Sequence, residues 1–71
     1  MTIDWTPHPD DPSTILASVD GVNRGYVRQM RGCGWYGRTD YAIDALWPDD
    51  GTEPAARALV ESAIRRALVG A

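Results

Sequence analysis

Few side chains of this sequence could act as a catalytic nucleophile or base, and they lie far apart along the chain. His8 is the only histidine and Cys33 is the only cysteine. Nucleophilic catalysis needs a nucleophile, a base and a group that orients the base. His8 stands in a proline-rich segment, and Cys33 stands in a glycine-rich turn with no histidine fixed near it. The sequence therefore predicts that the protein is not an enzyme.

Two acidic clusters contain the residue types of a metal site: His8, Asp10 and Asp11, and Asp49, Asp50 and Glu53. Hard cations bind clustered oxygen ligands, but neither cluster has the spacing of a twelve-residue calcium loop. Acidic residues just before a helix are also explained by capping and by the helix dipole. The turn 32–34 lacks the lysine and hydroxyl of a phosphate-binding loop. We therefore expect no metal and no cofactor.

A chain of 71 residues can bury one small core at most. We expect an irregular proline-rich arm over residues 1–13 and a single domain over residues 14–71. The start of the chain lacks the charged and apolar segments of a signal peptide, and no apolar run is long enough to cross a membrane. A lone cysteine suits a reducing compartment. These features predict a soluble cytoplasmic protein with no membrane partner. The absence of lysine and phenylalanine is typical of GC-rich codons and suggests a bacterium or its phage as the source.

The charge of the chain favours protein partners over nucleic acid. The formal net charge is -3, and all seven basic residues are arginines. Binding to nucleic acid depends largely on clustered cations that neutralise phosphates. A mildly acidic chain is a poor default binder of this kind, so nucleic acid is the less favoured partner.

Hydrophobic periodicity predicts strands followed by one helix. From Thr14, strand alternation points Ile15, Ala17 and Val19 to one side and Leu16, Ser18 and Asp20 to the other. Asp20-Gly21 then supplies the left-handed backbone of a tight hairpin. A second strand is expected from Val22 to about Met30, followed by a reversal at 31–34. The rest of the sheet runs from Trp35 to Ala45 or Trp47, either as one bent strand or as two shorter ones.

A helix is expected after the loop 47–52, with Thr52 or Asp50 as its cap and Gly70 at its end. Apolar residues recur at spacings of three and four from Ala56 to Leu68. This stripe needs an apolar sheet face, which we assign to Ile15, Ala17, Val19, Val27, Tyr41, Ile43 and Trp47. The fold class is therefore α+β, with three or four antiparallel strands and one C-terminal helix on one face.

Strand alternation then predicts an open, aromatic and charged face on the other side of the sheet. Tyrosine and arginine are enriched at interface hot spots. The alternative is a solvated face whose charges pair across strands for little net energy. We predict partner-binding residues on this face and in the loop 47–52 that follows it: Tyr26, Tyr36, Arg38, Asp40, Asp44, Asp49 and Asp50.

The runs 18–21, 25–28, 34–36 and 55–64 resemble many small phage and prophage proteins in which strands precede one helix. Among such proteins are the anti-CRISPR and other anti-defence proteins, which occupy a surface of a host complex without catalysis. The resemblance implies a host protein complex, such as a CRISPR effector complex, as the partner. It implies no individual contact residue.

Two other interpretations remain open. Three strands followed by a helix also resemble the arm-type DNA-binding domains of phage integrases, in which an open sheet enters a DNA groove. Arg24, Arg28 and Arg38 would then contact DNA, although Asp40 and Asp44 on the same face would oppose phosphate. An exposed strand edge would instead allow a homodimer, so the sequence permits either a monomer or a homodimer.

Overall fold

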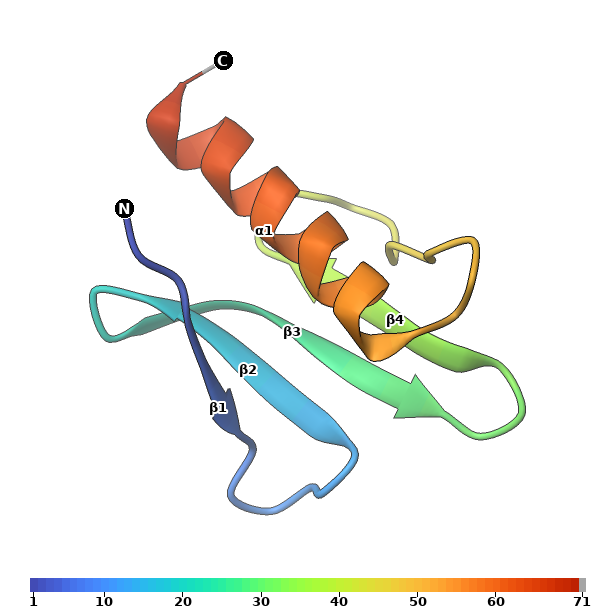
Figure 1. The fold of residues 1–71 in the computed structure, drawn as a ribbon. Coiled ribbons are helices and arrows are strands. Elements are labelled where there is room, and N and C mark those ends of the chain that lie inside the picture. The colour runs from blue at the N-terminus through green and yellow to red at the C-terminus, as the bar shows by residue number, and fades with distance from the viewer. Residues whose placement is uncertain (71) are drawn as a thin grey trace.

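The computed structural model describes residues 1–70 and shows an α+β fold (Figure 1). Four antiparallel strands form a meander in the order β1-β2-β3-β4, and the C-terminal helix α1 packs on one face of the sheet. Their bounds are β1 Asp4–Pro7, β2 Thr14–Val19, β3 Val22–Met30, β4 Gly34–Thr39 and α1 Glu53–Val69. The fold class predicted from sequence is confirmed, and residue 71 lies outside the described range. Among residues 1–70 no helix is long and apolar enough to cross a membrane.

The central hairpin has the predicted turn. Asp20 and Gly21 have φ angles of +52° and +79°, which are the left-handed values that a two-residue hairpin requires. The pairing of β2 with β3 places Ile15 opposite Val27 and Ala17 opposite Gly25. The register of this pairing shifts between Ala17 and Ser18. Because partners in an antiparallel pair share a face, this register places Ile15, Ala17 and Val27 on the side of the sheet that carries α1.

The prediction of an irregular arm over residues 1–13 is wrong in part, because this segment contains a strand. Asp4–Pro7 forms the edge strand β1, in which Trp5 pairs with Ala17 of β2. Pro7 ends this strand, as an edge position allows. The Trp5 Nε1 atom donates a hydrogen bond to Glu61 Oε2 at 2.7 Å, and the Arg57 guanidinium lies 5.1 Å from the ring centroid. The arm is therefore tied to α1.

Helix α1 begins and ends at the predicted residues. The Thr52 side chain accepts a hydrogen bond from the Ala55 amide, and Gly70 follows the last turn with φ +79°. Ala56, Val60 and Ile64 are the buried residues of α1. Val60 sits over Gly25 of β3 and Gly37 of β4, where the missing side chains let the helix approach the sheet closely. The core comprises Ala17, Val19, Val27, Ala56, Val60 and Ile64.

The segment after β4 differs from the expected strand. Strand β4 ends at Thr39, and the chain turns away before Leu46 returns to pair with Gly37 through hydrogen bonds of 2.7 and 2.8 Å. The prediction of Tyr41 and Ile43 as core residues is wrong, because this turn carries both outward and leaves Ile43 95% exposed. We call residues 40–52 the acidic loop. It runs beside β4 and covers that edge of the sheet.

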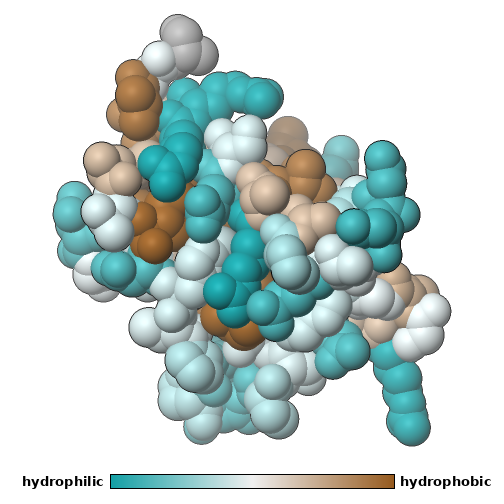
Figure 2. Space-filling view, viewed as in Figure 1, coloured by the Kyte–Doolittle hydropathy of each residue, from teal (hydrophilic) through white to brown (hydrophobic). Residues whose placement is uncertain are grey.

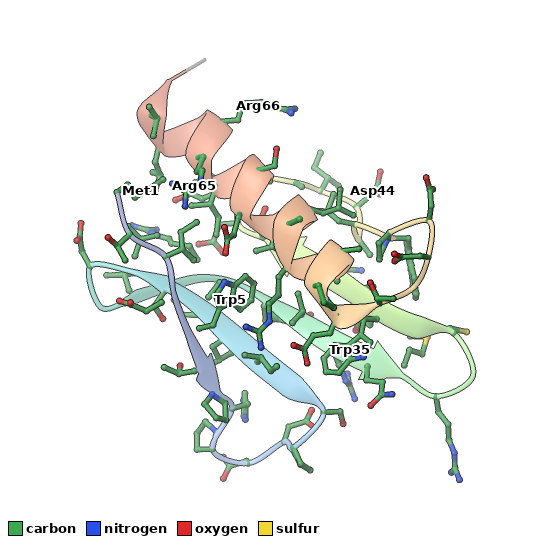
Figure 3. The ribbon with its side chains drawn as sticks, viewed as in Figure 1. Met1, Trp5, Trp35, Asp44, Arg65 and Arg66 are labelled. Carbon is green, nitrogen blue, oxygen red and sulfur yellow. The ribbon has the colours of Figure 1, made fainter. Side chains whose placement is uncertain are left out.

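The helix-bearing side of the molecule is a mosaic of apolar and polar surface (Figure 2). Trp5 and the acidic loop lie on opposite sides of α1, and Asp44 marks the loop side in Figure 3. The ion pairs Glu53–Arg57 at 2.9 Å and Glu61–Arg65 at 3.7 Å run along the helix surface. The sheet face turned away from α1 has no element packed across it among residues 1–70, and it carries the predicted site.

Candidate functional site

The open face is built around a cluster of three aromatic rings. Tyr26 on β3 and Tyr36 on β4 lie edge to face, with ring centroids 6.5 Å apart. The Trp47 ring stacks on Tyr36 at a centroid distance of 4.9 Å and an interplanar angle of 30°. Tyr36 is therefore only 6% exposed, whereas Trp47 keeps 49% of its surface in water. Stacking fixes the Trp47 ring and leaves half of it available for a contact.

Tyr26 contributes a protonated hydroxyl to this cluster. Partial burial, and secondly the neighbouring Tyr36, raise the pKa of Tyr26 above its ordinary value. The phenol is thus neutral throughout the physiological range and can donate a hydrogen bond. Tyr26 also lines a pocket of about 250 Å³ together with Asn23, Gly25, Arg38, Thr39 and Asp40.

The arginines of the open face differ in whether a carboxylate of the same chain already pairs with them. Arg24 lies 3.7 Å from Asp40, and Arg28 lies 3.7 Å from Asp11. Arg38 is exposed and has no carboxylate within ion-pair distance among residues 1–70. Exposed ion pairs contribute little stability, but they partly neutralise a cation before a partner arrives. Arg38 is therefore the arginine of this face that is best placed to meet an external anion.

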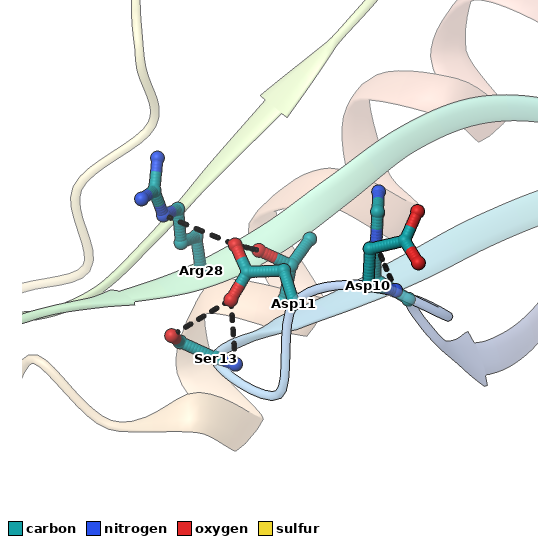
Figure 4. Close-up of polar contacts among 6 residues, drawn as sticks. Asp10, Asp11, Ser13 and Arg28 are labelled. Carbon is teal, nitrogen blue, oxygen red and sulfur yellow. Dashed lines mark hydrogen bonds and ion pairs between the residues drawn. The ribbon is translucent and has the colours of Figure 1, made fainter.

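The first acidic cluster is a structural turn (Figure 4). Asp11 accepts hydrogen bonds from the Ser13 amide and hydroxyl at 2.9 Å and from the Thr14 hydroxyl at 2.8 Å. These bonds, with a smaller effect of Arg28, lower the pKa of Asp11. His8 Nδ1 accepts a hydrogen bond from the Asp10 amide at 3.0 Å. Within residues 1–70 no group of three histidine, cysteine, aspartate or glutamate side chains is placed to hold a metal ion.

The second acidic cluster is divided: Asp49 and Asp50 lie in the acidic loop, away from the sheet face, whereas Glu53 begins α1 and pairs with Arg57. Asp44 and Asp49 are exposed and have no ion-pair partner among the described residues. Asp50 Oδ1 accepts bonds from the Thr52 amide at 3.0 Å and from its hydroxyl at 2.9 Å, and both bonds lower the pKa of Asp50. The Asp50 carboxylate is therefore charged at neutral pH and held in position.

The predicted site residues thus fall into two groups. The structure brings Tyr26, Tyr36, Arg38 and Asp40 together at the β3–β4 half of the open face. Asp44, Asp49 and Asp50 lie in the acidic loop and do not join that group.

Trp47 links the two groups, and sequence reasoning placed it wrongly in the core. Leu46 pairs with Gly37 and packs against the core, so the next residue of this extended segment points to the other face. The sequence did contain a signal for the correct placement of Trp47. Neighbouring residues of an extended segment point to opposite faces, so Leu46 and Trp47 cannot both face the helix.

The two nucleophile or base candidates lie in separate turns. His8 follows β1, whereas Cys33 is exposed between β3 and β4. The open face presents the aromatic rings and Arg38, and the acidic loop beside it presents Asp44, Asp49 and Asp50. Comparison of the chain with protein-family models, with curated proteins and with solved structures finds no match.

Proposed function

We propose that this protein is a non-enzymatic binding module that docks on a partner protein through the open face around Trp47. The observation that carries the proposal is the half-exposed Trp47 ring, stacked on buried Tyr36. Tryptophan, tyrosine and arginine dominate the binding energy of protein interfaces. A ring already held by stacking loses little further conformational entropy on binding, so more of its contact energy becomes affinity.

In its finer form, the proposal is that the module inhibits a host complex, as an anti-CRISPR protein does with a CRISPR effector complex. The net charge of -3 and the exposed Asp44 and Asp49 suit a basic protein surface of the kind that binds nucleic acid. Occupation of such a surface would block it without any chemical step.

The test is capture of bacterial host proteins by the tagged protein from a nuclease-treated lysate. We expect one protein complex in stoichiometric amount with the wild type and at least tenfold less with Trp47→Ala or Arg38→Glu. Arg31→Glu is the matched control, because it makes the same charge change at an exposed turn residue outside the open face. Circular dichroism checks that each variant is folded. Equal capture by the Arg38→Glu and Arg31→Glu variants would contradict the placement of the docking surface on the open face.

Nucleic acid is the second candidate partner, and the open face itself favours it. Arg24, Arg28 and Arg38 lie on that face beside aromatic rings on which bases could stack. Against it, Asp40 and Asp11 already partner the first two arginines. Fluorescence anisotropy with single- and double-stranded DNA tests whether the protein binds nucleic acid. A nucleic-acid binder loses affinity steeply between about 50 and 200 mM salt and when the three arginines become alanine.

A further inference from the structure

A second surface lies on the helix side of Trp47, between the acidic loop and the first half of α1. It is a pocket of about 350 Å³ lined by Trp47, Pro48, Asp49, Asp50, Ala55, Ala58 and Leu59. We call it the α1 groove. Its walls are apolar: an indole edge, a proline ring, two alanine methyls and Leu59, which is 36% exposed. Its charged lining residues are both aspartates.

The α1 groove is held open by bonds within the chain. The Gly51 carbonyl accepts a hydrogen bond from the Trp35 amide at 2.8 Å, and the Gly51 amide bonds to the Pro48 carbonyl at 3.2 Å. Asp50 anchors Thr52, which caps the helix wall. Both walls are therefore fixed relative to each other, so a ligand would not have to order them. Preformed pockets lose less free energy to ordering on binding.

The negative charge of the groove is not neutralised by the described part of the chain. Arg57, on the same helix, points to the other flank, where it pairs with Glu53 and lies over the Trp5 ring. Asp49 has no ion-pair partner among residues 1–70, and Asp44, elsewhere in the acidic loop, has none either. An apolar cleft with uncompensated carboxylates attracts apolar groups that carry positive charge and repels phosphate.

From this complementarity we infer that the α1 groove binds a segment of the partner protein in which an apolar side chain is flanked by arginine or lysine. The apolar side chain packs between Trp47 and Leu59, over the methyl groups of Ala55 and Ala58. The flanking cations reach Asp49 and Asp50. The inference rests on the proposed function and extends it, because it specifies the chemistry of the partner.

The test uses a phage-displayed library of random twelve-residue peptides selected on the full chain. Peptides with an apolar residue next to arginine or lysine are expected to dominate, and the best is then titrated by isothermal calorimetry. Ala58→Glu places a carboxylate side chain in the groove from an exposed helix position, and it should weaken binding at least tenfold. Ser62→Glu, one helical turn further on and outside the lining, is the matched control. Asp49→Asn should weaken binding roughly two- to fivefold at low salt.

Several results would overturn the inference. They are a neutral or acidic consensus, equal affinity of the Ala58→Glu and Ser62→Glu variants, or no enrichment at all. Concentration-dependent self-association that is lost in the Ala58→Glu variant would assign the groove to a second copy of the chain and would also overturn it. Arg38→Glu separates the two proposals. If Arg38→Glu abolishes capture of the partner from the lysate while Ala58→Glu leaves that capture unchanged, the groove inference fails and the proposed function stands.

Discussion

Gly37 is the position at which one added methyl group should disturb the fold most clearly. A Cβ atom at Gly37 would overlap Val60 Cγ2, well inside the contact distance of about 3.5–4.0 Å for two carbon atoms. Val60 is fully buried on α1, and the Ala56 and Tyr26 carbonyl oxygens lie 3.5 Å from the same Cβ position, so the added methyl group has no free space beside Val60. The helix must therefore shift away from β4 when Gly37 becomes alanine.

The magnitude follows from two opposing effects. Overpacking of a filled core costs about 1–3 kcal/mol. Replacement of glycine by alanine restricts the unfolded chain and returns about 0.4–1 kcal/mol. We expect Gly37→Ala to lower the free energy of unfolding by about 1–2 kcal/mol. A domain of this length has roughly 4–10 kcal/mol in total. The melting temperature should fall by roughly 5–15 °C.

Urea unfolding followed by circular dichroism measures this change, and a double-mutant cycle identifies its cause. Val60→Ala removes the methyl group that Gly37→Ala meets, so the double variant should be more stable than the sum of the single effects predicts, by about 0.5–3 kcal/mol. Ser62→Ala, exposed on the same helix, should combine additively with Gly37→Ala. Wild-type stability of Gly37→Ala, or additivity with Val60→Ala, would refute the reasoning.

Two further predictions concern the N-terminal segment. Trp5→Phe removes the donor to Glu61 and should lower the free energy of unfolding by about 1 kcal/mol, measured by urea unfolding; an unchanged midpoint would contradict a role for this bond. The pKa of Asp11 is lowered in the folded chain, so its stabilisation is present above the unfolded pKa and disappears as the pH falls through the folded value. Asp11→Asn should therefore lower the melting temperature at pH 7, with the difference shrinking below about pH 4; a difference that persists at pH 2 would contradict the assignment.

Local signals explain which elements the sequence could predict. The hairpin β2–β3 follows from alternation on both sides of Asp20-Gly21, and the bounds of α1 follow from Thr52 and Gly70. In each case the residues that set the structure are neighbours in sequence. The positions of Tyr26, Tyr36 and Arg38 on one face follow from the same alternation, once the strands are known.

The errors arose where distant contacts decide the structure. Pro7 and its neighbouring prolines argued against a strand in the arm, yet an edge strand needs bonds on one side only, and β2 supplies them to β1. The apolar alternation after Trp35 suggested a strand that continues to Trp47. Instead, the chain turns after Thr39, and Leu46 pairs with Gly37. No pattern within 40–46 specifies where the returning segment meets β4.

Gly37 connects the core to both proposed binding surfaces. Its bare α-carbon admits Val60, which sets the height of α1 above the sheet, and its amide and carbonyl bind Leu46. With Leu46 facing the core, Trp47 must project to the opposite side, where Tyr36 receives its ring. The exposure of Trp47 is thus a consequence of strand register rather than of poor packing. A displaced helix in Gly37→Ala should therefore widen the α1 groove and weaken the pairing that holds Trp47 in place, so the stability and binding defects of this variant should appear together.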